Sequence, residues 1–251
     1  MGVWELDLEN REEDAGVEMS EIYRFSNGVM LRRAELLDIQ LARYAQLGNP
    51  NLHEPVEERW LLQTFEEKIP SIPIFLDVGA AVGYYSILIK LRFANARVIS
   101  VEPLPRHIKA LQNNLILNGL NFTDVSILPV AISTVNGTAP FIERDFSSML
   151  GSPLTRSSLH VATRTLSSIL SELPQVHLMK MDIQGAESEV LMSAHTVLSE
   201  GRIRHMVIGT HDEKKHQALV GFVKTAGYRV AVDDPSPPMQ PDGLIVATFD
   251  S

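Results

Sequence analysis

The sequence predicts an α/β fold, a seven-stranded and mostly parallel sheet with helices on both faces. Two observations predict it. From residue 73 onward, short apolar runs alternate with stretches of helical periodicity, which is typical of parallel strands joined by crossover helices. After the fifth such unit, two β-rich runs at 228–232 and 244–249 follow one another with no room for a helix between them. They predict a C-terminal antiparallel hairpin.

The chain has 251 residues, and we divide it into an N-terminal extension or cap, residues 1–68, and a main domain, residues 69–251. In the extension, Ser26-Asn27-Gly28 lies between two β-rich runs and predicts a turn. Helical spacing follows it, and Gly48-Asn49-Pro50 ends the first helix. The elements expected after the acidic start (1–20) are a hairpin at 22–25 and 29–31 and helices at 34–47 and 55–68.

The strands and helices of the main domain are predicted from the same patterns. The expected parallel strands lie at 74–78, 97–101, 125–129, 176–181 and 204–208. The expected helices lie at 84–93, 107–118, 186–198 and 214–226. Segments 141–162 and 233–242 read as loops, and loops of this kind carry specificity in α/β proteins.

Composition narrows the possible partners. The formal net charge is −9 and there is no Lys/Arg cluster, so we expect no nucleic-acid partner. No apolar run reaches the roughly 18–20 residues of a membrane span, and the start lacks the apolar core of a signal peptide. We therefore expect no membrane partner and a cytoplasmic location. The absence of cysteine excludes disulfides and thiolate metal sites.

A glycine-containing turn, Asp77-Val78-Gly79-Ala80-Ala81-Val82-Gly83, follows the first strand of the main domain and opens a helix. In a doubly wound sheet, ligands bind at such turns. Glu102 ends the next strand, 25 residues after Asp77. There a carboxylate can accept hydrogen bonds from both ribose hydroxyls of an adenosine.

The glycine spacing bears on which adenosine compound binds. The G-x-x-x-G spacing differs from the G-x-G-x-x-G of dinucleotide sites, which argues against an NAD(P)-dependent oxidoreductase. An acidic, phosphate-free pocket suits S-adenosylmethionine, and Asp77 can hold the ammonium of its methionine end directly or through water.

Several blocks resemble one known family. They are Phe75-Leu76-Asp77-Val78-Gly79-Ala80 through Gly83-Tyr84-Tyr85-Ser86, Glu102-Pro103, Leu128-Pro129-Val130-Ala131-Ile132-Ser133, Phe146-Ser147-Ser148-Met149, and Lys180-Met181-Asp182-Ile183-Gln184-Gly185-Ala186-Glu187. Over about residues 53–250 the chain resembles FkbM-type methyltransferases. The resemblance implies a Rossmann-like class I methyltransferase fold, S-adenosylmethionine as cofactor and O-methylation of hydroxyls on sugars or natural products. The chain departs from the family pattern at Ser167, Gln184 and Gly209, where acidic residues are usual.

The turn, Glu102 and the matched blocks together give the expected cofactor-binding residues. These are Asp77, Gly79, Ala80, Gly83, Tyr85, Ser86, Glu102, Pro103, Ala131, Ile132, Ser148 and Asp182.

Three residues are the catalytic candidates, all at the carboxyl ends of the fourth and fifth strands. Asp182 can orient the acceptor or take its proton, or it can cap the next helix. Glu187 can pair with it or only favour the helix dipole. His211 can act as a neutral base near pH 7, or be an ordinary loop histidine. The sequence lacks a tight metal-ligand spacing, so we expect no required metal.

The sequence thus predicts an S-adenosylmethionine-dependent O-methyltransferase acting on a small-molecule hydroxyl. N-methylation of an amine or amide, and a cofactor-binding protein without catalysis, stay open as alternatives. The N-terminal extension is expected to close over the acceptor or to form a homodimer contact.

Overall fold

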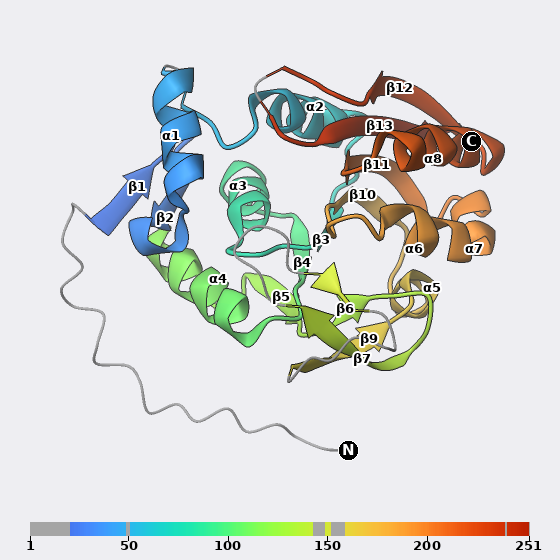
Figure 1. The fold of residues 1–251 in the computed structure, drawn as a ribbon, viewed down its shortest axis with the longest axis horizontal. Coiled ribbons are helices and arrows are strands. Elements are labelled where there is room, and N and C mark those ends of the chain that lie inside the picture. The colour runs from blue at the N-terminus through green and yellow to red at the C-terminus, as the bar shows by residue number, and fades with distance from the viewer. Residues whose placement is uncertain (1–20, 49–50, 143–148, 152–158, 239, 251) are drawn as a thin grey trace.

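A computed structural model describes residues 21–48, 51–142, 149–151, 159–238 and 240–250. Seven strands form the main sheet (Figure 1) in the order β12-β13-β11-β10-β3-β4-β5. Their bounds are β3 (Ile74–Val78), β4 (Arg97–Val101), β5 (Val125–Leu128), β10 (Val176–Met181), β11 (Ile203–Thr210), β12 (Tyr228–Asp234) and β13 (Gly243–Phe249). Strand β13 runs antiparallel to both of its neighbours, and the other pairs are parallel. The predicted fold class is confirmed.

Helices cover both faces of this sheet (Figure 1). One face carries α2 (Pro55–Glu66), α3 (Tyr84–Arg92) and α4 (Pro105–Leu117), and the other carries α5 (Leu166–Leu170), α6 (Glu187–Ser193), α7 (His195–Ser199) and α8 (Glu213–Thr225). Successive side chains of a strand point to opposite faces, so Phe75 packs with the first set and Leu76 with the second. Both faces of the central strands are therefore buried, which explains their continuous apolar runs.

The extension contains a hairpin of β1 (Ile22–Arg24) and β2 (Met30–Arg32), a 3₁₀ turn η2 (Arg33–Glu35) and α1 (Asp38–Leu47). The side chains of Asn118, directly after α4, and of Asn114 on α4 accept hydrogen bonds from the backbone N–H groups of Met30 and Arg32, at 2.8 and 3.0 Å. The helix expected from residue 34 starts four residues later, because the 3₁₀ turn is followed by extended backbone.

Helix α2 belongs to the main packing unit. Leu61 and Phe65 are fully buried in the same cluster as Leu178 and Val207 of the sheet. The hydrophobic core is therefore continuous across residue 69. The division of the chain into two domains at this residue stays a prediction.

A second sheet was not predicted. It consists of β6 (Ala131–Ile132), β7 (Gly137–Ile142), β8 (Met149–Leu150) and β9 (His160–Arg164) in the order β6-β9-β7-β8. The expectation of a loop over 141–162 is wrong at both ends, where β7 and β9 lie. The sequence did not reveal the second sheet because its strands are short and Pro140 interrupts the β pattern.

The helix expected over 186–198 is divided into α6 and α7. At Ala194 the backbone N–H bonds to the carbonyl of Leu191, an i→i−3 bond that tightens and ends the first helix.

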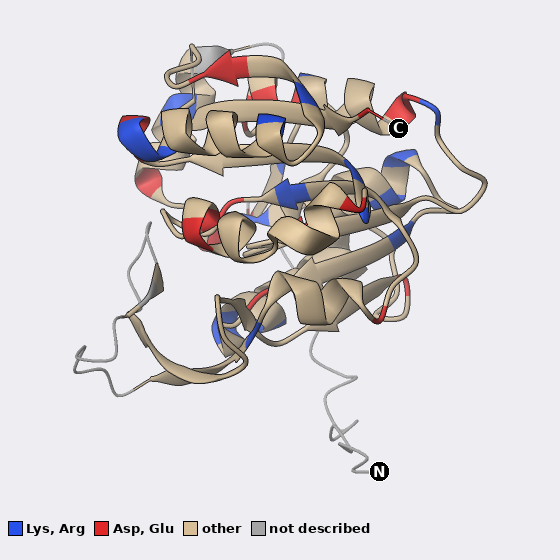
Figure 2. Cartoon of the chain, turned by 90° about the vertical axis from the view of Figure 1, so that its right-hand side faces the viewer, with Lys and Arg blue, Asp and Glu red and all other residues tan. Residues whose placement is uncertain are grey.

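Among the described residues, no helix has the length and apolarity needed to cross a bilayer. Figure 2 shows acidic and basic positions interspersed along the described elements. The expected lack of a nucleic-acid partner rests on net charge and stays a prediction.

Candidate active site

The turn after β3 is held by close backbone contacts. Gly79 has φ +83°, and a Cβ atom there would lie 1.9 Å from the carbonyl oxygen of Asp182. Gly83 has φ +93°, and a Cβ there would lie 2.8 Å from Cγ of Leu111. Packing within the protein therefore requires glycine at both positions. The missing side chains also leave the backbone open to a ligand.

Glu102 fixes this turn from the end of β4. Its carboxylate accepts hydrogen bonds from the backbone N–H groups of Ala81 and Leu104, each at 3.0 Å, and lies 3.2 Å from Nδ1 of His107. Ala81 has φ +45°, an unfavourable conformation for a residue with a side chain. The carboxylate thus stabilises the turn and still lines the cavity described below.

Asp77 and Ser86 lie beneath the turn. Oγ of Ser86 donates to Asp77 Oδ2 at 2.6 Å, and both residues are buried. Burial raises the pKa of Asp77, and its Oδ1 atom has no hydrogen-bond partner among the described residues. Neither residue lines the cavity, so a role for them with a ligand is indirect.

A cavity of about 930 Å³ opens at the carboxyl ends of β3, β4 and β10. Its walls include most of the predicted cofactor-binding residues, namely Gly79, Ala80, Tyr85, Glu102, Pro103, Ala131, Ile132 and Asp182. Gly83 supports the wall without lining it, and Ser148 lies outside the described residues. Residues of η2 and α1, including Gln40 and Arg43, complete the wall, so the N-terminal extension closes over this cavity.

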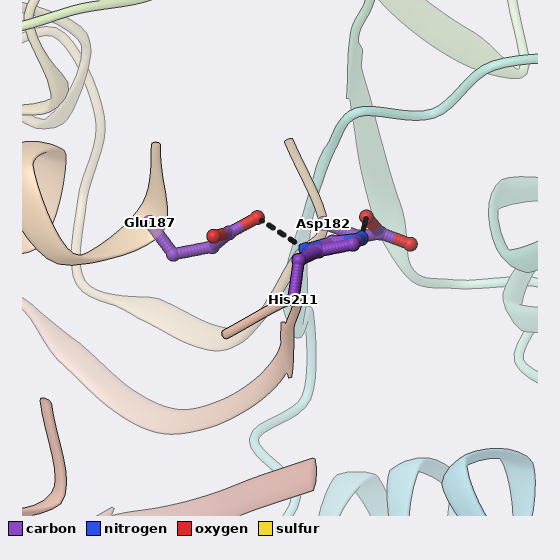
Figure 3. A group of neighbouring side chains, drawn as sticks. All are labelled: Asp182, Glu187 and His211. Atoms are coloured by element: carbon purple, nitrogen blue, oxygen red, sulfur yellow. Dashed lines mark ion pairs between the residues drawn. The ribbon is translucent and has the colours of Figure 1, made fainter. Parts of the chain in front are cut away.

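The three catalytic candidates meet beside the cavity, with the ring of His211 between two carboxylates (Figure 3). Nδ1 of His211 lies 3.3 Å from Glu187, and Nε2 lies 3.4 Å from Asp182. Glu187 also accepts hydrogen bonds from the backbone N–H groups of Ile183 and Gly185. Asp182 makes no cap to α6, whose first position is preceded by Ala186.

The expected neutral imidazole is not supported. Burial opposes the charged form of His211, but the adjoining carboxylates of Glu187 and Asp182, together with that of Asp242, outweigh burial and raise its pKa to about 9. At pH 7 the ring is therefore cationic and holds its proton.

A second histidine near the fifth parallel strand, His216, is not at the surface. It is fully buried and bonds to Thr210 at 2.7 Å. It lies on the same face of α8 as Leu219 and Val223, three and seven residues later.

The family profile described as "Methyltransferase FkbM domain" matches residues 77–230, more than half of the chain. The chain belongs to the FkbM methyltransferase family. Membership of this family and the class I fold imply S-adenosylmethionine as the methyl donor.

Two curated relatives of this FkbM methyltransferase are fungal. Methyltransferase sdnD of Sordaria araneosa is 27% identical over 160 residues, which are 49% of this chain and 61% of the relative. Methyltransferase 1 of Beauveria bassiana (strain ARSEF 2860) is 24% identical over 66% of this chain and 76% of its own length. The chain thus spans about three fifths of the length of the first relative.

A crystal structure of methyltransferase FkbM from Methylobacillus flagellatus KT is similar in fold. Its TM-score is 0.52 at 17% identity, over 74% of this chain and 46% of that one. This likeness supports the class I fold and carries no information about the acceptor.

Sequence reasoning missed Lys180, which lines the cavity of this FkbM methyltransferase. Its side chain is 4% exposed and lies 3.7 Å from Glu57, 3.4 Å from Asp182 and 4.8 Å from the ring centre of Tyr85. Burial raises the pKa of Glu57 to about 8, so Asp182 is the charged partner of Lys180 at neutral pH. The signal was a lysine within a buried and mostly apolar strand, where an unpaired charge is costly.

Asp242 and Gln184 were also missed. Oδ1 of Asp242 lies 3.3 Å from Nε2 of His211. The pairing of Thr210 with Gly243 brings these two residues together, and that register is not readable from local sequence. Gln184, at φ +60°, donates from its amide to Asp182 at 3.1 Å, so a strained residue orients the carboxylate.

Proposed function

We propose that this methyltransferase transfers the methyl group of S-adenosylmethionine to a hydroxyl of a small polar molecule, such as a sugar or another natural product. One observation carries the proposal. A single cavity of about 930 Å³ joins the Glu102 turn to the polar group of Asp182 and Asp242. That volume is near the upper end for small-molecule sites, which suits two molecules side by side.

The cofactor end of the cavity fits an adenosine. Glu102 keeps its carboxylate at the cavity wall after accepting two backbone hydrogen bonds, and such a group suits ribose hydroxyls. Ala80, Ala131 and Ile132 give a small apolar wall that suits an adenine ring. When bound, the cofactor supplies a methyl group on sulfur, which keeps the electron pair of the breaking C–S bond.

The acceptor end holds groups for a hydroxyl. Asp182 and Asp242 face the cavity, and the cationic ring of His211 lies between them and Glu187. These two carboxylates can accept the hydrogen bond of an acceptor hydroxyl and fix its oxygen in line with the methyl group. As the C–O bond forms, the hydroxyl proton leaves to this acidic wall.

An amine acceptor is the second candidate, because carboxylates outnumber lysine and arginine side chains along the cavity. The carboxylates are Glu35, Glu54, Glu102, Asp182 and Asp242, and the basic side chains are Arg43, Arg106 and Lys180. An acidic wall attracts a cationic acceptor.

The test uses S-adenosylmethionine with an isotopically labelled methyl group and paired acceptors, each sugar beside its amino-sugar analogue. We expect label in a methyl ether of the sugar. We also expect His211→Gln to lower turnover about 10²-fold with cofactor affinity retained, because the cationic ring positions the carboxylates of Asp182 and Asp242. His195→Gln, at an exposed position on α7, is the matched control. Label only on nitrogen would support the amine acceptor, and cofactor binding with no transfer to either series would support a binding protein.

A further inference from the structure

We infer that Asp242 is the general base that takes the proton of the acceptor hydroxyl during methyl transfer. The inference rests on the proposed function and names the one carboxylate of the cavity wall that receives the proton. Asp242 lies directly before β13 and lines the cavity, with its side chain 19% exposed. Its backbone carbonyl accepts a hydrogen bond from Gln240, which in turn accepts one from the backbone N–H of Glu57 on α2, at 3.3 and 3.1 Å. The chain is therefore anchored beside the cavity at this point.

The imidazole of His211 does not fit the role of this base. The residue does not line the cavity, and both of its ring nitrogens are shielded from solvent. The ring also carries its proton at pH 7, because the adjoining carboxylates outweigh burial and raise its pKa to about 9. Its Nε2 atom lies 3.4 Å from Asp182 and 3.3 Å from Asp242. The cationic ring therefore positions these two carboxylates and leaves proton transfer to one of them.

Asp182 and Asp242 differ in the number of groups that stabilise their charge. The partners of Asp182 are the Lys180 ammonium at 3.4 Å, the Gln184 amide at 3.1 Å and His211. Asp242 has its ion pair with His211, and no other hydrogen bond or ion pair reaches its carboxylate from the described residues. Donors to a carboxylate favour its charged form and so weaken it as a base. Asp182 is therefore the fixed anion that orients the acceptor, and Asp242 is the stronger base.

The charges around Asp242 agree with this division. Burial is the main cause that raises the pKa of Asp242 to about 6, and the negative charges of Asp182 and Glu54 act in the same direction. The positive charges of His211 and Lys180 oppose this rise. At Asp182 the same two cations outweigh burial and lower the pKa. A base with a pKa just below the working pH is ionised and still takes up a proton readily.

Lys180 and Glu54 line the same cavity, and neither suits the role. At Lys180 the surrounding carboxylates outweigh burial and raise the pKa, so the ammonium holds its proton. Glu54 is 6% exposed and accepts a hydrogen bond from the hydroxyl of Tyr85 at 2.9 Å. Its carboxylate is thus less accessible than that of Asp242 and already has a donor.

His53 is a neutral imidazole in the cavity wall, because burial lowers its pKa. Its Nδ1 atom shares a hydrogen bond with the hydroxyl of Tyr44, and its Nε2 atom lies 4.0 Å from the carboxylate of Glu54. A carboxylate only accepts, so Nε2 carries the proton of the neutral ring and Tyr44 donates to Nδ1. Neither ring nitrogen is left to accept a proton from the substrate.

The proposed step balances in atoms and charge. A lone pair of the acceptor oxygen forms the bond to the methyl carbon, and the electron pair of the broken C–S bond stays on sulfur. The O–H bonding pair stays on the oxygen, and the proton passes to Asp242, which becomes a neutral carboxylic acid. The acid releases this proton to water as the methylated product leaves, which restores the carboxylate.

The experiment follows kcat/KM against pH with the sugar that accepts the labelled methyl group. In the wild type this value should fall below a pH of about 6, because protonated Asp242 cannot act as a base. Asp242→Asn should remove this acidic limb and lower kcat about 10²-fold or more, with the affinity for S-adenosylhomocysteine retained. Asp182→Asn should move the limb to lower pH, because a neighbouring negative charge is lost. Asp250→Asn, 62% exposed beyond the other end of β13, is the matched control and should keep the wild-type rate and profile.

A second measurement needs no acceptor. In protein with ¹³C-labelled aspartate carboxyl groups, the NMR signal that Asp242→Asn removes should titrate near a pH of about 6. The signal that Asp182→Asn removes should titrate below the ordinary range of aspartate. Circular dichroism checks that each variant is folded, and Asp242→Ser replaces Asp242→Asn if that variant is not.

Three results would overturn the inference and leave the proposed function in place. They are an acidic limb that persists in Asp242→Asn, a limb that is lost in His53→Gln while Asp242→Asn keeps it, and an Asp242 signal that titrates in the ordinary range of aspartate. Label on nitrogen alone would contradict the proposed function, and this inference with it.

Discussion

At the scale of single residues, the site depends on carboxylates whose surroundings differ sharply. Glu102 accepts two backbone hydrogen bonds and serves the turn as well as the cavity. Glu57 is buried with its pKa raised to about 8, while Lys180 and His211 lower the pKa of Asp182 against the effect of burial. Neighbouring acids of the same chemical type therefore have different charges at neutral pH, which is typical of functional sites.

Replacement of Glu102 by alanine should weaken binding of S-adenosylhomocysteine by about 1–3 kcal/mol, because charge-assisted hydrogen bonds to the ribose are lost. Isothermal calorimetry gives the affinity directly. Glu189→Gln, at an exposed position on α6, is the control and should leave the affinity unchanged. Equal affinity in Glu102→Ala and wild type would mean that another group holds the ribose.

At the scale of elements, the strands and turns that were predicted correctly are those that a local sequence pattern encodes. The strands of the main sheet have continuous apolar runs and the turn after β3 has its glycines, so both were predicted to within a few residues. The second sheet was missed because β6 and β8 have only two residues each. The contact of Asp242 with His211 depends on the register of β11 and β13, which only the folded chain defines.

Glycine substitutions test the packing of the turn. Gly79→Ala adds a Cβ 1.9 Å from the Asp182 carbonyl oxygen at a φ of +83°, and should lower the free energy of unfolding by about 3 kcal/mol or more. Gly221→Ala is the matched control on α8, where no atom lies within 4 Å of the added Cβ. It should raise stability by about 0.5–1 kcal/mol. Urea denaturation measures both, and a harmless Gly79→Ala would contradict the close contact.

At the scale of the whole molecule, one sheet has the cavity at one edge and a buried histidine pair away from it. His177 and His205 have ring centres 5.1 Å apart, each near the start of its strand and so away from the cavity. Burial, with His177 and Arg204 nearby, lowers the pKa of His205 to about 4. The folded chain therefore resists protonation at this position.

This pair predicts a loss of stability in acid. The unfolded chain binds a proton at His205 near pH 6.5, whereas the folded chain does so only near pH 4. The free energy of unfolding should therefore fall as the pH drops from about 6.5 toward 4, by about 1–2 kcal/mol at pH 5. His205→Leu should make the Tm less dependent on pH between 7 and 5. His160→Gln, at an exposed position on β9, should keep the wild-type slope. Parallel slopes for wild type and His205→Leu would contradict the prediction.

The central claim is that the turn after β3 and Glu102 hold one adenosyl group at the edge of the sheet. Calorimetric titration of S-adenosylhomocysteine into the wild-type chain tests it most directly. We predict one site per chain, competed by S-adenosylmethionine and weakened by Glu102→Ala. Absence of measurable binding to the folded wild-type protein would contradict the claim.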